Sequence, residues 1–230
     1  EQIIDIAFRF HSQGNISEAA KYYQLFINQG FEDHIVFSNY GVILKNLGKL
    51  EEAEIVTRKA IKMDSSLANA HYNLSTILRD LGKLEEAKVA TQKAINLRPD
   101  FVKAHFTLGL IYKDLGKLED AEIATQKAIN LNPDLAEAYS NLGSILKDLG
   151  KLKEAEIALR KAIELKPDIA ESYSNLGGIL IALGKSKEAE IPLRKAIELK
   201  SASVNAYWNL YLLANNIQDA EANLNQCLKI

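Results

Sequence analysis

Five asparagine side chains recur at matching places along the chain, within the similar stretches SNYG, YNLS, SNLG and WNLY. They are Asn39, Asn73, Asn141, Asn175 and Asn209. An amide side chain both donates and accepts hydrogen bonds, so it can pair with the N–H and the C=O of a peptide backbone. Asparagine inside a helix costs about 0.5–0.7 kcal/mol relative to alanine, or roughly 3 kcal/mol over five sites. A cost of this size favours a function for these amides.

Other residues offer little chemistry. His71 and His105 occupy equivalent places in two similar stretches, AHYNL and AHFTL. Helices in contact lie about 8–10 Å apart, too far for two such side chains to share a metal with bonds of about 2 Å. Cys227 is the single cysteine and is expected to pack in the core. The sequence shows no phosphate-binding loop and no pair of nucleophile and base. It therefore predicts a protein that is not an enzyme and has no catalytic residue, metal or cofactor.

The composition excludes several classes of partner. The chain has 28 basic and 30 acidic residues and a net charge of −2, which predicts neither nucleic-acid nor membrane binding. No apolar run approaches the roughly 18–20 residues of a membrane span, and no signal peptide opens the chain. With one cysteine, a reducing, cytoplasmic location is expected. Because the chain starts without methionine and ends inside a helical pattern, it is expected to be a fragment of a longer protein.

A repeat of constant length organises the sequence. LGKLEEAE returns as LGKLEEAK, LGKLEDAE, LGKLKEAE and LGKSKEAE. The glycine of this motif and one earlier glycine recur at one fixed interval, at Gly14, Gly48, Gly82, Gly116, Gly150 and Gly184. A period of about 34 residues, as here, is typical of paired helices in tetratricopeptide repeats. With Gly143 as position 8 of its repeat, Tyr139 falls at position 4, Leu146 at 11, Ala155 at 20 and Pro167 at 32, as in that family.

The chain therefore resembles the tetratricopeptide repeat (TPR) family over essentially its whole length. The resemblance implies an all-α fold, a right-handed superhelix (α-solenoid) of seven stacked helix–turn–helix repeats within one domain, 1–230. The predicted repeats are 1–33, 34–67, 68–101, 102–135, 136–169, 170–203 and 204–230. In each repeat, helix A ends at a glycine such as Gly150, which can adopt the left-handed conformation. Helix B ends before a proline such as Pro167, and Asp168 is predicted to cap the next helix A.

The asparagines occupy position 6 of their repeats. At about 100° per residue, positions 4, 7, 8 and 11 gather on one side of helix A, while positions 2, 6, 9 and 13 gather on the other. In TPR superhelices this second side lines a concave groove, so the five amides are predicted to form a row along it, interrupted by Asp5 and Thr107. The repeats also resemble those of O-linked N-acetylglucosamine transferases, in which an asparagine at this position holds the backbone of protein substrates.

We therefore expect a protein-interaction module that binds an extended peptide or a disordered segment. Alternatively, the asparagines arose by repeat duplication, are merely solvated, or bond to neighbours across the stack. Apolar pockets for the partner are predicted at Tyr72, Phe106, Leu110 and Trp208, although Tyr72 and Phe106 could instead pack against neighbouring helices A. In repeats five and six the equivalent residues are small, which would leave room for a ligand backbone: Ser140, Ser144, Ser174 and Gly178.

Charges on the same helices predict a salt-bridged surface. Position 12 is basic in repeats two to five, with Lys45, Arg79, Lys113 and Lys147. Position 13 beside it supplies Asp80, Asp114 and Asp148. Alternating signs of this kind favour ion pairs over an anion-binding site.

Two further functions remain open. The chain could recruit substrates for a larger glycosyl- or sulfo-transferase whose catalytic domain lies outside these residues. It could also self-associate through its end repeats, because the final helix, DAEANLNQCLKI, lacks an evident polar cap.

Overall fold

The computed structural model describes residues 2–200, 203–213 and 225, and these residues form thirteen α-helices and no strand. The helices are α1 (Gln2–Ser12), α2 (Ile16–Asn28), α3 (His34–Asn46), α4 (Leu50–Met63), α5 (Ala68–Asp80), α6 (Leu84–Leu97), α7 (Val102–Asp114), α8 (Leu118–Leu131), α9 (Ala136–Asp148), α10 (Leu152–Leu165), α11 (Ala170–Ala182), α12 (Ser186–Leu199) and α13 (Val204–Leu213). The predicted final helix, with Cys227, lies outside the described residues.

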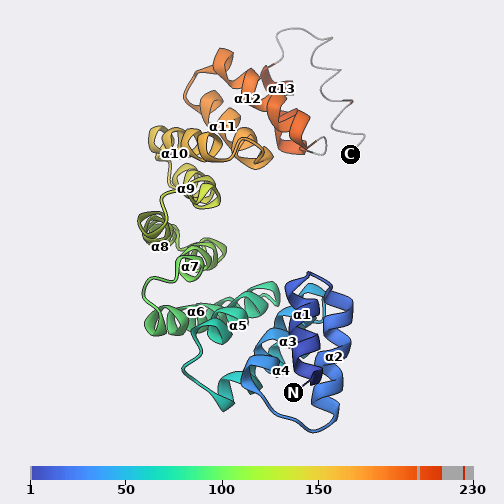
Figure 1. Ribbon diagram of the computed structural model, residues 1–230. Coiled ribbons are helices and arrows are strands. Elements are labelled where there is room, and N and C mark those ends of the chain that lie inside the picture. Colours follow the sequence, from blue (N-terminus) through green and yellow to red (C-terminus); the bar gives the residue numbers. More distant parts are fainter. Residues whose placement is uncertain (1, 201–202, 214–224, 226–230) are drawn as a thin grey trace. The chain divides into compact units, whose positions relative to one another are not determined.

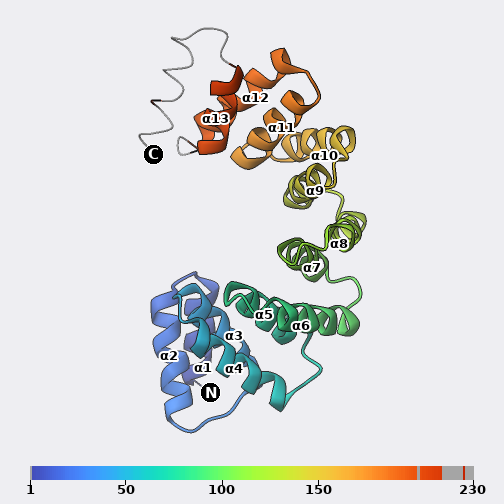
Figure 2. The same cartoon turned by 180° about the vertical axis from the view of Figure 1, so that it is seen from behind.

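Within each unit the helices follow one another as antiparallel hairpins, α1–α2, α3–α4 and α5–α6 in the first and α9–α10 and α11–α12 in the second (Figures 1 and 2). Odd-numbered helices are helices A and even-numbered helices are helices B. Within a unit, each helix A contacts its own helix B and the preceding helix B, and from α3 onward it also contacts the next helix A, whereas successive helices B make little contact. No repeat buries its apolar face alone, so stacked neighbours share the core. The predicted all-α, α-solenoid fold class is confirmed.

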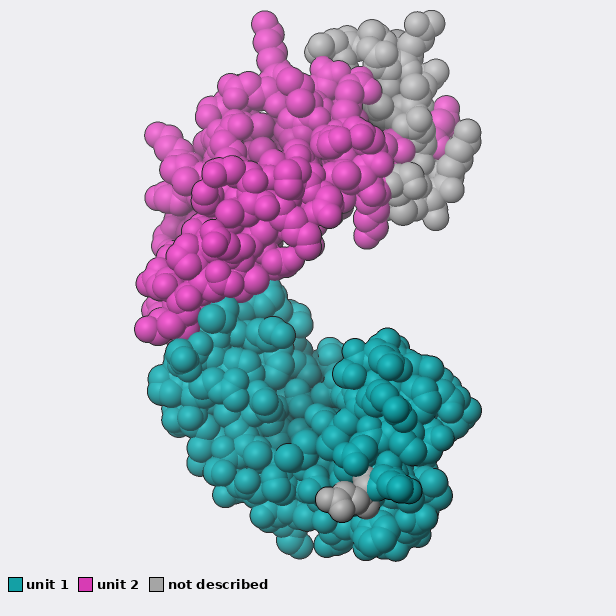
Figure 3. All heavy atoms as spheres, viewed as in Figure 1, with its two compact units in different colours: residues 1–115 teal, residues 116–230 magenta. Residues whose placement is uncertain are grey.

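The helices divide into two compact units, residues 1–115 and 116–230 (Figure 3). The boundary lies in the turn between α7 and α8, inside the predicted repeat 102–135. Each unit is described by itself below. The assignment of the whole chain to one domain stays a prediction.

The turn that joins helix A to helix B in each described pair is built as the sequence predicts. Gly150 has a φ of +75°, and its N–H donates to the carbonyl of Lys147 at 2.9 Å. The N–H of Lys151 reaches back to the carbonyl of Leu146 at 2.8 Å. These two bonds close the Schellman motif that ends a helix. The other five glycines of the period have the same left-handed conformation.

The predicted aspartate caps are wrong. Pro167 and Asp168 form the turn itself, and the N-cap of α11 is the next residue, Ile169, which makes no side-chain capping bond. The same holds for α7 and α9. Only α3 follows the expected chemistry of an aspartate cap, because Asp33 directly precedes the helix and accepts the N–H of Val36 at 2.8 Å.

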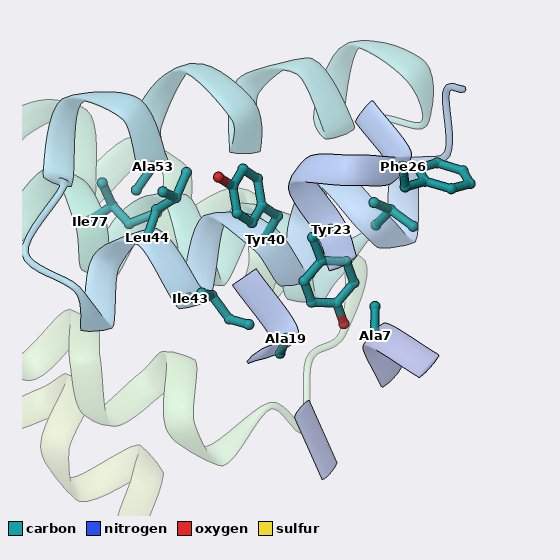
Figure 4. Close-up of a cluster of buried hydrophobic side chains, with 10 residues drawn as sticks. Ala7, Ala19, Tyr23, Phe26, Tyr40, Ile43, Leu44, Ala53 and Ile77 are labelled. Carbon is teal, nitrogen blue, oxygen red and sulfur yellow. The ribbon is translucent and has the colours of Figure 1, made fainter. Parts of the chain in front are cut away.

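The core of the first unit shows how the repeats are joined. Tyr23 of α2 is completely buried beside Ala7 of α1, and its ring centroid lies 6.1 Å from that of Tyr40 in α3 (Figure 4). Small residues such as Ala19 and Ala53 are also fully buried and let the helices approach closely. The core thus runs from one repeat into the next through position 24 of helix B, which Tyr23 occupies.

Candidate functional site

Two of the five asparagines join their helix A to helix B of the preceding repeat. Asn141 of α9 is 9 % exposed, and its Nδ2 donates to the hydroxyl of Thr125 in α8 at 3.2 Å. Burial raises the pKa of Tyr23 in α2 to about 12, and the side chain of Asn39 in α3 interacts with the tyrosine and opposes that rise. Thr125 and Tyr23 both occupy position 24. A hydroxyl at position 24 can therefore serve as the partner of the next asparagine.

The third asparagine uses another neighbour. Asn73 of α5 donates from Nδ2 to the hydroxyl of Ser38 in α3, at 3.3 Å. Thr57, at position 24 of the preceding repeat, consequently keeps a buried hydroxyl with no hydrogen-bond partner among the described residues. Where position 6 is Thr107, the threonine at position 24, Thr91, donates instead to the carbonyl of Ala87 in its own helix.

Valine substitutions at two of these threonines are expected to have opposite effects. Thr57→Val should raise the free energy of unfolding by about 1 kcal/mol, because it removes a buried hydroxyl that has no partner. Thr125→Val should lower it by about 1–2 kcal/mol, because the buried amide of Asn141 loses its acceptor. Urea denaturation of the two variants beside the wild type measures both changes. The same sign for both would contradict the bonding described above.

The last two asparagines have no such partner. Position 24 of the preceding repeats holds Leu159 and Leu193, whose side chains cannot accept a hydrogen bond. No side-chain hydrogen bond joins Asn175 or Asn209 to another residue that the structure describes. Both asparagines instead line a pocket of about 190 Å³ between α11 and α13, here called the asparagine pocket. The rest of its lining consists of Lys147, Ser174, Gly178, Asn205 and Trp208.

A cation of the asparagine pocket also lacks its usual partner. In the first unit, Lys45 pairs with Asp80 at 3.1 Å and Arg79 with Asp114 at 2.6 Å, which confirms the predicted pairing of positions 12 and 13 there. Lys147 stands at position 12 of repeat five, but position 13 of repeat six is Ala182. Lys147 makes no ion pair within the described part of the chain. Its charge is therefore available inside the pocket.

The walls of the asparagine pocket combine an apolar surface with open space. Trp208 is 50 % exposed and its ring centroid lies 5.4 Å from that of Tyr211. Gly178 has no side chain, which leaves space beside Asn209, because a Cβ there would lie 3.4 Å from Nδ2 of Asn209. A second pocket of about 350 Å³ shares Ser174, Asn175 and Asn205 and adds Lys200. The two pockets together follow α11 and α13 over more than one helical turn.

The other predicted site residues lie in the first unit and are all partly buried. The ring of Tyr72 packs on Phe101, directly before α7, with 5.0 Å between the ring centroids. This contact agrees with the alternative in which Tyr72 packs against the neighbouring repeat. Phe106 and Leu110 belong to α7. Trp208 is thus the one predicted aromatic residue that borders the asparagine pocket.

Sequence reasoning singled out the asparagines but missed what sets two of them apart. Leucine replaces a hydroxyl-bearing residue at position 24 before Asn175 and Asn209, and Ala182 replaces the aspartate that would pair with Lys147. All three changes can be read by comparing the repeats position by position. Their effects meet in one pocket only because the helices are stacked.

The histidines and the lengths of the helices bear on metal and membrane binding. They contain no cluster of three or more histidine, cysteine, aspartate or glutamate side chains that could hold a metal ion. Nε2 of His71 lies 3.0 Å from the carbonyl of Ser65, and Nε2 of His105 lies 2.8 Å from that of Pro99, so both rings hold the preceding turn. Among the helices described, none has the length and apolar character needed to cross a bilayer.

Family models cover most of the chain. Models described as tetratricopeptide repeat match residues 1–28, 36–67 and 134–202, and one described as TPR repeat matches 76–116 and 109–150. The chain belongs to the tetratricopeptide repeat family. The helix pairs, the left-handed glycines and the shared core are thus those of a TPR protein. No curated protein sequence matches this TPR chain.

Several solved TPR-type structures are similar to it. YrrB, described as a TPR protein with an unusual peptide-binding site, is 27 % identical, with a TM-score of 0.65 over 82 % of this chain and 97 % of its own. MamA is 25 % identical, with a TM-score of 0.65 over 74 % of this chain and 96 % of its own. A tetratricopeptide repeat protein from Parabacteroides merdae reaches a TM-score of 0.76 at 19 % identity, over 99 % and 91 % of the two chains, and supports the fold alone.

Proposed function

We propose that this TPR chain is a protein-interaction module that binds an extended peptide or a disordered segment along α11 and α13 of its second unit. The observation that carries the proposal is the set of unpartnered polar groups in the asparagine pocket. Asn175, Asn209 and Lys147 make no side-chain hydrogen bond or ion pair with a described residue, whereas the equivalent side chains in other repeats do. The similarity to YrrB, described as having a peptide-binding site, supports the same function.

The pocket chemistry suits a peptide backbone. Asn175 and Asn209 are one repeat apart, and each amide can accept an N–H and donate to a C=O of an extended chain. Recognition of main-chain groups demands little of the ligand sequence. Trp208 adds an apolar wall, and large aromatic side chains dominate the energetics of many interfaces. Lys147 favours a ligand with a carboxylate beside the bound backbone.

Of the five asparagines predicted to bind the peptide, two are proposed to do so, Asn175 and Asn209. The amides of Asn73 and Asn141 already form hydrogen bonds within the protein, and the side chain of Asn39 interacts with Tyr23. A ligand that used those amides would first have to break contacts between repeats. Such a ligand would therefore gain less from each of them than from Asn175 or Asn209.

A pair of double variants tests the proposal. Peptides selected from a random library on the wild-type chain would be titrated against Asn175→Ala/Asn209→Ala. We expect the dissociation constant to rise at least about tenfold, since each lost hydrogen bond is worth about 1 kcal/mol. The matched control, Asn39→Ala/Asn73→Ala, should bind within about twofold of wild type. Circular dichroism confirms that both variants fold. Unchanged binding by the first variant would overturn the proposal.

A further inference from the structure

An exposed aliphatic side chain recurs on helix B of five consecutive repeats, at position 22. The residues are Ile55, Val89, Ile123, Ile157 and Ile191. Their exposed fractions range from 62 % at Val89 to 76 % at Ile191. Single exposed aliphatic residues are ordinary, but a large one repeated at the same position of every helix B from α4 to α12 is not. In the first repeat the position is Lys21, so the apolar row begins at α4.

The fold explains the residue before two of them but not the aliphatic residue itself. Position 21 is a glutamate in α4, α8, α10 and α12, and in α4 and α10 its side chain is turned inward. Glu54 accepts hydrogen bonds from Arg58 at 2.9 Å and from Lys83, in the next turn, at 2.7 Å. Glu156 does the same with Arg160 and Lys185. In α4 and α10 an inward acid thus ties neighbouring repeats together, while the aliphatic side chain beside it points into solvent.

In the first unit this row borders an apolar pocket, here called the α4–α6 pocket. It encloses about 660 Å³, and Ile61, Leu74, Leu78 and Ala90 form its apolar lining, with Val89 beside them. The equivalent positions between α10 and α12 enclose about 360 Å³. The two pockets differ at position 4, where they have His71 and Tyr173, and at position 23, where they have Ala90 and Pro192. The smaller ring of His71, held to the carbonyl of Ser65, and the smaller side chain of Ala90 both leave space in the α4–α6 pocket.

The charged side chains around the α4–α6 pocket make this surface complementary to the same surface of a second copy. The exposed face of α4 begins with Glu51 and Glu52, continues with Ile55 and ends with Arg58, Lys59 and Lys62. The face of α6 begins with Glu85 and Glu86, continues with Val89 and ends with Lys93. Both helices therefore run from acidic through apolar to basic, the order that the helix dipole favours. A second copy laid antiparallel would place basic ends opposite acidic ends.

Some of these charged side chains form ion pairs within the protein, and others form none with a described residue. Arg58 pairs with Glu86 at 2.6 Å and Lys59 with Glu32 at 2.8 Å. Glu51, Lys62 and Lys93 make no ion pair with a residue in the described ranges. In the second unit α8 keeps this order, from Glu119 and Asp120 to Lys127. The order is broken in α10 and α12, which have Lys153 and Lys187 near their starts and Glu164 and Glu198 near their ends. Among the described helices of either unit, two successive helices B share the order only in α4 and α6.

We propose that α4 and α6 form a self-association surface, on which a second copy of this chain packs by a two-fold axis. In such an isologous interface the same surface of each copy meets the other, so Ile55 and Val89 of one copy cover the α4–α6 pocket of its partner. The surface lies on helices B and is separate from the peptide-binding function proposed above. It also differs from the predicted self-association through the end repeats.

Sedimentation velocity of the full chain over a concentration series tests the proposal. We expect a concentration-dependent dimer, and a dissociation constant at least about tenfold higher for Ile55→Glu/Val89→Glu, because a charge replaces the apolar centre of the interface. The matched control, Ile157→Glu/Ile191→Glu, changes equally exposed residues of the second unit and should leave the constant within about twofold. Both variants should melt like the wild type, since all four side chains are exposed.

A second variant tests the pocket without adding charge. His71→Tyr places at position 4 the residue that Tyr173 has in repeat six, and its ring should fill part of the α4–α6 pocket. We expect dimerisation to weaken about tenfold. A chain that stays monomeric at all concentrations would overturn the proposal. So would a dimer that neither Ile55→Glu/Val89→Glu nor His71→Tyr weakens, or one that the control weakens equally.

Discussion

Replacing Gly177 by alanine is expected to lower the free energy of unfolding by about 2 kcal/mol, although alanine favours helices by about 1 kcal/mol over glycine. Gly177 packs against helix B of its own repeat, and a Cβ there would lie 2.4 Å from both Cγ and Cδ2 of Leu193. Leu193 is completely buried, so it cannot move aside without disturbing the core. Overpacking of this kind typically costs about 1–3 kcal/mol.

The next residue provides the control. At Gly178 a Cβ would have only one close neighbour, Nδ2 of Asn209 at 3.4 Å, which is an ordinary contact. Gly178→Ala should therefore raise the free energy of unfolding by up to about 1 kcal/mol. Because repeat proteins can unfold in parts, hydrogen exchange of α11 and α12 should accompany urea denaturation. Equal stability of the two variants would contradict the packing described for Gly177.

Removing the carboxylate of Glu156 is expected to lower the free energy of unfolding by about 1.5 kcal/mol at neutral pH. Its side chain is largely buried, and it accepts hydrogen bonds from Lys185 of the following turn at 2.8 Å and from Arg160 at 2.9 Å. Glu156→Ala thus removes a tie between repeats five and six. The matched control is Glu190→Ala, at the same position of repeat six. Glu190 is exposed and, among the residues that the structure describes, pairs only with Arg194 one turn away, so less than about 0.5 kcal/mol should be lost.

The pH dependence of the same variant gives a second test. The hydrogen bond from Lys185, with that from Arg160, lowers the pKa of Glu156 below its ordinary value of 4.5. A carboxylate with a lowered pKa stabilises the folded state fully above its unfolded pKa and loses that contribution as the pH falls through its folded pKa. The difference in unfolding free energy between wild type and Glu156→Ala should therefore shrink from about pH 4.5 downward. A constant difference down to the folded pKa would contradict this assignment.

The fold could be predicted almost entirely from the spacing of residues. The constant period of the repeat placed helices A and B, and the left-handed glycines confirm the turn within each described helix pair. The aspartate caps failed because capping depends on one residue of register, and Pro167–Asp168 ends one residue too early. Local propensity could not supply that register, since it is set by the packing of two repeats.

The candidate site was predicted only in part. Helical periodicity placed all five asparagines on one side of helix A, but it could not tell which amides would be free. That depends on residues of other helices, such as Thr125 at position 24 for Asn141 or Ser38 at position 5 for Asn73. The exposed residues at position 22 were missed for a related reason. The inward glutamate beside them is stabilised by a lysine of the following turn, which a single-helix pattern does not contain.

Position 24 has a consequence for how binding surfaces of this kind diversify. Thr125 and Leu159 are both completely buried, so neither can contact a ligand. Yet the first occupies an amide of the next helix and the second leaves one available. Duplicated repeats can therefore all carry the same asparagine, while buried residues behind it determine in which repeats the amide is available to a ligand. A new specificity would then arise from substitutions in the interior, with the contact residues themselves unchanged.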